Sequence, residues 1–399
     1  MKKMLVFLFV ILFVLKSTGG YTFESDKSSQ QKMVASNNYF ALSFYKHLSK
    51  GKNIFYSPYS LYSAMLMIYG GAEGETKSEM EKKLRIRLDI KDLYSVSKDK
   101  EQQLLALGQE EGYKINLANA FWSQKGYEFK KEYLELIQSN YTAKISSVDF
   151  WEDKEEACRV INSWVEEKTE RKIKELITPE LIKKHLTTCV LTNAVYFQGD
   201  WKLQFDKENT EEEYFYSEKE KKDKILMMKQ KENFPYFSND KFKVIELPYS
   251  QNRMKMLVFL PDKKYGLAKL ENYLTPEKLK EIQSNMENEK INLHFPRFEI
   301  KSDLELEKEL TKYGLETMFD RNAGFSGISE EVLFITDVLQ KSFVVVDEKG
   351  SEATASSGII VSRKGLPLDF FVNRPFLFLI LTEQTEEIIF MGRFTGYRS

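Results

Sequence analysis

The residues that could carry acid–base or nucleophilic chemistry are few and scattered. The chain of 399 residues contains three histidines, His47, His185 and His294, and each is expected to be a surface or packed imidazole. Nucleophilic hydrolysis needs a nucleophile, a base that accepts its proton and donors for the oxyanion. Residues 324–327 (GFSG) come near a nucleophile elbow, but no strand-like run leads into them. The sequence therefore disfavours an enzyme.

Motifs for metals, cofactors and phosphate are also missing from the sequence. It has no HExxH, no CxxC pair and no glycine-rich phosphate loop, so we expect neither a metal nor a cofactor. Acids such as those at 211–213 lie in a charge run, which is usually solvated. The 59 basic residues against 60 acidic ones give a net charge of −1, which disfavours nucleic acid as a partner.

The most unusual stretch lies near the C-terminal end, at residues 350–371 (GSEATASSGIIVSRKGLPLDFF), between two strand-like runs. A long connection of this kind is uncommon in a compact domain and is usually functional or disordered. In an extended chain alternate side chains share a face. One face would be uniformly small: Ser351, Ala353, Ala355 and Ser357. The other would tolerate water: Glu352, Thr354 and Ser356. The pattern suits a strand able to enter a crowded gap in a sheet, although its composition also fits a flexible linker.

The elements that must position this stretch change in character along the chain. The first third is mostly helical by period, with helices expected at 37–49, from Ser57-Pro58 to Gly70-Gly71, at 77–88 and at 130–141. From residue 187 onward the period approaches two. Strands are expected at 188–201, 241–250, 254–262, 291–300, 342–348, 376–383 and 386–394, with helices between them at 275–286 and 303–314. No repeat or linker divides the chain, so we expect a single α+β domain.

The N-terminus has the layout of a secretory signal. Lys2 and Lys3 precede an apolar run at 4–15, and Lys16 and small residues follow it. The run of 12 residues is too short to span a bilayer comfortably. We therefore expect residues 1–20 to be a signal peptide and residues 21–399 to form a secreted protein with no membrane segment.

The two cysteines and the one glycosylation sequon complete the features of a secreted chain. Cys158 lies in a charged helical stretch and Cys189 begins an apolar strand, and two cysteines do not make a disulfide framework. We expect two free thiols, with a single bridge as the alternative. Asn140-Tyr141-Thr142 is an acceptor sequon, which predicts a glycan at Asn140.

Several long motifs resemble those of the serpin family, in the right order and over the whole mature length. They lie at residues 53–76 (NIFYSPYSLYSAMLMIYGGAEGET), 192–205 (TNAVYFQGDWKLQF), 293–300 (LHFPRFEI), 325–329 (FSGIS), 338–357 (VLQKSFVVVDEKGSEATASS) and 373–380 (NRPFLFLI), followed by IFMGRF. The resemblance implies an α+β serpin fold with three β-sheets and about nine helices. It also implies an exposed reactive-centre loop at about 348–372.

The resemblance further implies inhibition by a suicide substrate. A target serine protease cuts the loop and forms an acyl-enzyme, and the freed hinge then inserts into the central sheet and traps the protease. Family spacing, counted from Glu348 or back from Asn373, places the reactive bond at Lys364–Gly365, with Arg363 as the alternative. A base there suits a trypsin-like protease, whose specificity pocket carries a buried acid. The alternative function is a non-inhibitory serpin that acts as a carrier, storage or binding protein.

The resemblance also assigns roles to individual residues that match positions in the family's motifs. The hinge comprises Glu348, Gly350, Ser351, Glu352, Ala353, Thr354, Ala355, Ser356 and Ser357. The region called the breach comprises Trp201, Arg297, Lys341 and Glu348, with Arg297 expected to pair with Glu348. The cluster called the shutter comprises Ser57, Ser60, Asn193 and Gln340, where many members have histidine in place of Gln340.

The expected partner is a trypsin-like serine protease in covalent complex with a monomeric inhibitor. A glycosaminoglycan is a weaker expectation, because acids alternate with the bases that would bind it, and a solvated helix face explains them as well. Those bases are Lys82, Lys83, Arg85 and Arg87. Neither a nucleic acid nor a membrane is expected as a partner.

Overall fold

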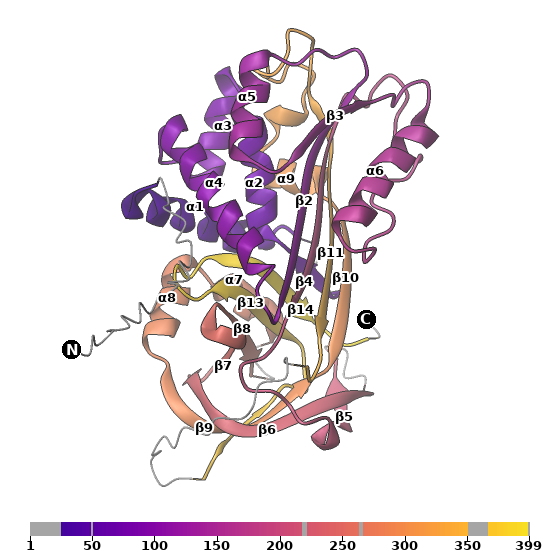
Figure 1. Ribbon diagram of the computed structural model, residues 1–399. Helices are drawn as coiled ribbons and strands as arrows, with labels where there is room; N and C mark the ends of the chain where they lie inside the picture. The colour runs from indigo at the N-terminus through magenta and orange to yellow at the C-terminus, as the bar shows by residue number, and fades with distance from the viewer. Residues whose placement is uncertain (1–24, 49–50, 218–221, 263–265, 350–365, 398–399) are drawn as a thin grey trace, which may run out of the picture.

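The computed structural model describes residues 25–48, 51–217, 222–262, 266–349 and 366–397 (Figure 1). These residues form nine α-helices: α1 (Lys27–Tyr45), α2 (Pro58–Tyr69), α3 (Gly74–Leu84), α4 (Ile90–Leu107), α5 (Lys131–Asn140), α6 (Lys154–Lys168), α7 (Leu267–Tyr273), α8 (Pro276–Ser284) and α9 (Glu307–Tyr313). The expected signal peptide at 1–20 lies outside the described residues.

Fourteen strands accompany the helices in the described part of the chain. They are β1 (Ile54–Tyr56), β2 (Tyr113–Gln124), β3 (Lys144–Val148), β4 (Cys189–Gly199), β5 (Glu211–Tyr216), β6 (Lys222–Ser238), β7 (Phe242–Pro248), β8 (Met254–Pro261), β9 (Glu287–Pro296), β10 (Phe298–Glu305), β11 (Ile335–Val346), β12 (Leu368–Phe371), β13 (Phe376–Thr382) and β14 (Ile388–Phe394). The α+β class is confirmed.

Hydrogen bonding arranges these strands in a five-stranded sheet and a nine-stranded sheet. The first has the order β10-β11-β4-β2-β3, and the second has the order β1-β14-β13-β8-β7-β6-β9-β12 with β5 added on β6. The long strand β6 pairs with β9 over most of its length and with β7 near its end. Because β6 belongs to both groups of strands, the second and third sheets implied by the resemblance are continuous.

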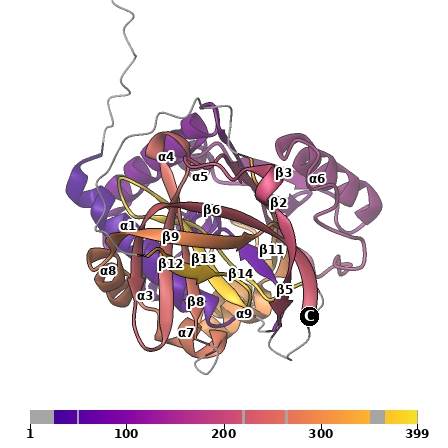
Figure 2. The same ribbon diagram turned by 90° about the horizontal axis from the view of Figure 1, so that it is seen from below.

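The five-stranded sheet lies between two helical layers. Helices α1–α5 cover one face, and α6 covers the other (Figure 1). Seen from below, the nine-stranded sheet curves around the other end of the molecule, with β12 beside β9 (Figure 2). The two faces of the five-stranded sheet therefore have different environments, one against the main core and one against α6.

Helix α2 forms the centre of the main core because its sequence specifies both its ends and its burial. The Ser57 side chain accepts a hydrogen bond from the Ser60 N–H, Pro58 occupies the first turn, and Gly70 is the C-cap. All twelve of its residues are buried. Gly71 follows in close contact with another segment, since a Cβ there would lie 2.9 Å from the Ile328 nitrogen. The predicted helix boundaries at Ser57-Pro58 and Gly70-Gly71 are confirmed.

The structure differs from the sequence-based expectation in two strands that shape the five-stranded sheet. Strand β2 lies in the part expected to be helical, and its second half is buried on both faces, which hides the period of two. Residues 291–300 are not one strand but two, β9 and β10, which lie in different sheets. Phe295 and Phe298 are both buried although three positions apart, so the inward-facing alternation changes phase around Arg297.

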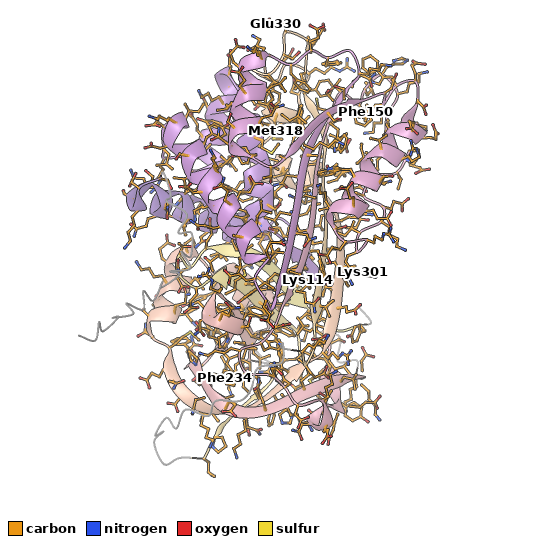
Figure 3. All side chains as sticks on the ribbon, in the orientation of Figure 1. Lys114, Phe150, Phe234, Lys301, Met318 and Glu330 are labelled. Atoms are coloured by element: carbon orange, nitrogen blue, oxygen red, sulfur yellow. The ribbon has the colours of Figure 1, made fainter. Side chains whose placement is uncertain are left out.

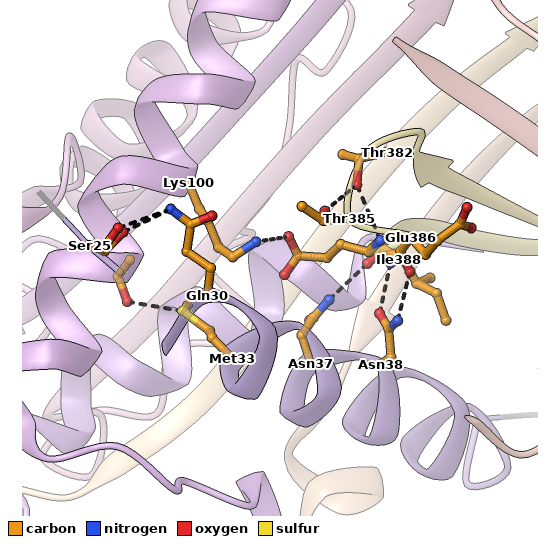
Figure 4. A network of polar contacts seen from close by, with 12 residues as sticks. Ser25, Gln30, Met33, Asn37, Asn38, Lys100, Thr382, Thr385, Glu386 and Ile388 are labelled. Carbon is orange, nitrogen blue, oxygen red and sulfur yellow. Dashed lines mark hydrogen bonds and ion pairs between the residues drawn. The ribbon is translucent and has the colours of Figure 1, made fainter. Parts of the chain in front are cut away.

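The turn between β13 and β14 is held against α1 and α4 by a polar network (Figure 4). Asn37 of α1 donates to the Ile388 carbonyl at 3.0 Å, and Asn38 donates to the Glu386 carbonyl at 2.8 Å. The Lys100 Nζ of α4 lies 2.6 Å from Glu387 Oε2, and the two side chains are only 4% and 3% exposed. This ion pair joins the C-terminal hairpin to the helical layer in a water-poor environment.

Replacing one member of this ion pair should destabilise the fold strongly. Lys100→Met should lower the free energy of unfolding by about 3–5 kcal/mol, because it leaves the Glu387 carboxylate buried without its counter-charge. The double variant Lys100→Met/Glu387→Leu should recover much of the loss. Chemical denaturation followed by circular dichroism measures both. Equal destabilisation in the single and double variants would contradict the assigned role of the pair.

Candidate functional site

The candidate site is the boundary between β4 and β11, called the seam from here on. The two strands are parallel and in direct register from Val344 opposite Phe197 to Asp337 opposite Val190. A parallel pair has slanted hydrogen bonds and is slightly less stable per residue than an antiparallel pair. A strand that followed β11 in sequence and entered the seam would run antiparallel to both neighbours. It would thereby replace one parallel pair with two antiparallel pairs.

Beneath the seam, on its α2 side, the four predicted shutter residues lie together and are fully buried. The Gln340 Oε1 accepts from the Ser57 N–H at 3.0 Å, and its Nε2 donates to the Ser57 carbonyl at 3.1 Å and to Asn193 Oδ1. One glutamine amide thus donates and accepts at the same helix start. Because glutamine does not titrate, these contacts carry no histidine-like dependence on pH.

Asn119 of β2 is a fifth member of this network and was absent from the predicted set. The Asn193 Nδ2 donates to Ser60 Oγ and to Asn119 Oδ1, and Ser60 Oγ donates to the same Asn119 oxygen at 3.0 Å. Asn119 lies directly opposite Asn193 in the β2–β4 register. An asparagine within the run LANAF was the available signal, but it became informative only once β2 was known to be a strand.

The breach residues gather at the C-terminal end of β11. The Trp201 indole N–H donates to the Asp347 carbonyl at 2.9 Å, and its ring stacks on Tyr249 with centroids 4.6 Å apart. The expected pairing of Arg297 with Glu348 is present, with Nη1 and Oε2 3.5 Å apart and the Glu348 side chain only 4% exposed. These contacts fix the last described residues before the hinge.

Lys341 was predicted to belong to the breach, but its ion-pair partner is not one of the other breach residues. Its ammonium pairs with Asp303 Oδ2 of β10 at 2.7 Å. Lys341 is one residue from Gln340 along β11, so it points to the opposite face of the sheet from the shutter. The structure therefore places this lysine on the α6 side of the sheet.

Most of the predicted hinge and bait positions lie outside the described residues. These are Gly350, Ser351, Glu352, Ala353, Thr354, Ala355, Ser356, Ser357, Arg363, Lys364 and Gly365. Their described flanks are fixed, because Val346 pairs with Phe298 and Leu368 pairs with Ile291. Residues 291 and 298, opposite these flanks, are separated by at most roughly 23 Å of extended chain, whereas the 21 residues from 347 to 367 could span roughly 70 Å. The connection is therefore much longer than the gap that it must cross.

Both cysteines are free and buried, as expected from their sequence settings. Burial raises the pKa of the Cys158 thiol to about 11 and raises the pKa of Cys189 well above its ordinary value. Both thiols are thus protonated and unreactive at neutral pH.

The glycan at Asn140 stays a prediction. Asn140 ends α5, and its Nδ2 donates to the Leu136 carbonyl at 2.7 Å. The Thr142 hydroxyl donates to Glu101 Oε1 at 2.6 Å. Both polar residues of the sequon thus have partners in the folded chain.

The bases considered for glycosaminoglycan binding lie in and just after α3, and Arg85 and Arg87 line the same hollow. The Lys83 ammonium donates to the Tyr313 carbonyl at 2.7 Å, and the Arg85 guanidinium lies 3.2 Å from the centre of the Tyr39 ring. Lys82 lies in the last turn of α3, and Arg87 lines a hollow with Glu277 and Glu386. Two of the four bases are therefore engaged by neighbouring side chains or backbone.

The three histidines lie in packed settings in the described ranges. Each histidine packs against an aromatic ring: His47 on Tyr313, His185 on Trp151 and His294 on Phe371. No group of three or more metal-ligating side chains occurs among the described residues. Within the same ranges, no helix is long and apolar enough to cross a membrane.

Comparison with known proteins agrees with this architecture. Residues 35–396 match the Serpin (serine protease inhibitor) family. The chain is 37% identical over 380 residues to leukocyte elastase inhibitor of Sus scrofa, covering 92% of this chain and 100% of that protein. It is 37% identical over 369 residues to Serpin B3 of Homo sapiens, covering 87% and 94%.

Solved structures give the same result. Native protease nexin-1 with heparin matches with a TM-score of 0.84 and 27% identity, covering 92% of this chain and 100% of that one. Uncleaved ovalbumin matches with a TM-score of 0.83 and 28% identity, covering 92% and 100%. The fold and its central seam thus define a serpin, and the chain belongs to the serpin family of serine protease inhibitors.

One half-buried acid on β11, Asp337, makes stability depend on pH. Burial, followed by the charge of Glu307, raises the pKa of Asp337 to about 7, whereas Lys183 opposes the shift and Glu305 adds to it. The folded state therefore binds a proton that the unfolded state has lost, and stability falls as pH rises from about 4 to about 7. The raised pKa of Asp337 corresponds to a change of at most about 4 kcal/mol in the free energy of unfolding.

Asp337→Asn should remove this part of the pH dependence and should stabilise the protein at pH 8 more than at pH 5. Melting temperatures across that range measure the effect. Asp303→Asn, at an exposed carboxylate of the adjacent strand, is the matched control and should leave the slope unchanged. Parallel pH profiles for Asp337→Asn and the unmodified protein would refute the assignment.

Proposed function

We propose that this serpin inhibits trypsin-like serine proteases by offering the bond Lys364–Gly365 as a substrate and trapping the enzyme that cleaves it. The observation that carries the proposal is the closed parallel seam directly before a segment with small residues at alternate positions. The seam is the place in the five-stranded sheet where a strand following β11 can enter next to β11. The adjacent bases Arg363 and Lys364 supply the specificity.

The chemistry begins with the protease and ends with a change in this chain. The protease serine attacks the Lys364 carbonyl, the bond to Gly365 breaks, and the Gly365 amine leaves with the proton that the protease base transferred. Lys364 is then joined to the protease as an ester. Entry of the freed segment into the seam moves this ester along the length of the sheet, and the distorted protease fails to hydrolyse it.

The faces of the seam explain why the hinge needs small side chains on one side. The residues of β11 that point toward α2 are Gln340, Ser342 and Val344, all of which are buried. Side chains of an entering strand that point the same way must share this filled space. Ser351, Ala353, Ala355 and Ser357 suit that face, whereas Glu352, Thr354 and Ser356 suit the α6 side.

The named relatives do not identify the target protease of this chain, so we infer its class from the residues of the loop. One relative is named for leukocyte elastase, whereas this chain carries two adjacent bases at the expected reactive position. We further propose secretion after removal of residues 1–20, on the strength of the signal-like N-terminus. The proposal requires that this chain acts as a monomer and that its partner is an extracellular trypsin-like protease.

The proposal is tested by incubating the mature protein with trypsin and with leukocyte elastase and resolving the products on a denaturing gel. We expect a complex of the summed mass with trypsin and a released peptide that begins at Gly365. Lys364→Ala should abolish the trypsin complex, whereas Arg363→Ala should preserve it. Simple clipping with fully active trypsin, repeated across a panel of trypsin-like proteases, would favour the carrier, storage or binding function.

Insertion itself is tested by the same charge placed on opposite faces of the hinge. Ser351→Arg should raise the number of inhibitor molecules consumed per trypsin by at least about tenfold, because an unpaired charge forced into the buried side of the seam costs several kcal/mol. Glu352→Arg should change this number by less than about twofold, since its side chain would lie on the α6 side, where the native residue already carries a charge. Titration of residual trypsin activity measures both variants, and equal effects would contradict the assigned faces.

A further inference from the structure

On its α6 side, the seam is bridged by two aromatic rings. Phe343 of β11 lies directly opposite Tyr196 of β4. Their ring centroids are 5.8 Å apart and their planes differ by 15°, and the residues are 7% and 1% exposed. The two residues are called the seam rings from here on. They contact each other across the boundary that the proposed mechanism must open.

Two lysines cover the seam rings from either side. The Lys172 Nζ lies 5.5 Å from the Tyr196 ring centre, and the Lys301 Nζ lies 5.2 Å from the Phe343 ring centre. Figure 3 places Lys301 on the β10 side of the sheet, below α6. Cation–π contacts of this kind add to the ring–ring contact when the rings are shielded from water. The closed seam therefore has a continuous row of side-chain contacts from Lys172 to Lys301.

The segment that carries Lys172 is itself held in an uncommon backbone conformation. Glu170 and Arg171, directly after α6, both have positive φ values, of 48° and 61°, which are costly for residues with a side chain. The conformation is fixed by the Arg171 N–H, which donates to the Glu166 carbonyl at 2.8 Å, and by the Lys172 N–H, which donates to the Thr169 carbonyl at 2.9 Å.

The position of the seam rings determines when they would be separated. The hinge follows the C-terminal end of β11, so an entering strand opens the seam from that end. The first pair there, Val344 with Phe197, points to the core side, and the next pair is Phe343 with Tyr196. Within the β4–β11 register, the seam rings are thus the first pair that an entering strand meets on the α6 side.

Insertion would abolish the contact between the rings. Neighbouring strands are about 4.8 Å apart, so one added strand would place the two residues about 9.6 Å apart, beyond the range of aromatic pairing. The alternation of the hinge would place Glu352, Thr354 or Ser356 between them, because these residues point to the same face. The ring–ring contact therefore stabilises the closed seam and not the opened one.

We propose that the seam rings, with Lys172 above them, set the rate at which the seam opens, and so determine how the cleaved inhibitor divides between trapping and release. This inference rests on the proposed function for its consequence, but the opening of the seam can be measured without any protease. A weaker ring contact would open the seam faster, both before and after cleavage.

The test is a double-mutant cycle read by hydrogen exchange of the full mature chain. Tyr196→Leu and Phe343→Leu should each accelerate exchange of peptides from β4 and β11 by about 2- to 12-fold, the range expected for loss of an aromatic pair. The double variant should exchange within about twofold of either single variant, because the shared contact is lost only once. Peptides from β7 and β8 serve as the internal reference and should not change.

Tyr196→Phe is the matched control, since it keeps the ring and removes only the hydroxyl that donates to Gln198. Its β4 and β11 peptides should exchange at the rate of the unmodified protein. Strictly additive leucine variants, unchanged exchange at the seam, or equal acceleration throughout the chain would each overturn the proposal.

A trypsin titration of the same variants separates this inference from the proposed function. Coupled exchange without any trypsin complex, in the variants or in the unmodified chain, would retain the role of the seam rings and reject inhibition of trypsin. A trypsin complex without coupled exchange would support inhibition of trypsin and reject the role of the seam rings. With both intact, Phe343→Leu should consume fewer inhibitor molecules per trypsin than the unmodified protein, and an equal number would contradict the effect of the seam rings on trapping.

Discussion

The structure depends on a parallel pair of strands, β4 and β11, in the interior of the five-stranded sheet. Parallel pairing is the weaker form of sheet hydrogen bonding, and the chain directly after β11 is long enough to fold back along it. In the proposed mechanism, the native arrangement persists because opening is slow, and its stability is then kinetic in origin.

The two faces of the seam are closed by different chemistry. On the α2 side, buried amides and hydroxyls form a directional network in which Asn119, Asn193 and Gln340 each come from a different strand. Such a network is stable only when its members are in register, since an unpaired buried polar group is costly. On the α6 side the contact is between aromatic rings, which tolerate small displacements. The polar face thus favours a single closed register, and the aromatic face adds a barrier to its opening.

The remainder of the molecule gives the seam a rigid surrounding. The buried pair of Lys100 with Glu387 and the amides of Asn37 and Asn38 hold the C-terminal hairpin against the helical layer. The Trp201 and Arg297 contacts fix the residues that lead into the hinge.

Local features of the sequence determined much of this protein. Capping residues and apolar runs specified α2, α3, α5 and α8 and most strands after residue 187, and long motifs specified the family, because these signals act over a few neighbouring residues. Only the tertiary structure decided that β2 is a central strand, that the chain changes sheets near Arg297, and that Lys341 faces α6. It alone also brought Asn119 to the shutter and Phe343 to Tyr196. Such contacts join residues as far as 283 positions apart, and their register follows from how strands pack together, which no local period encodes.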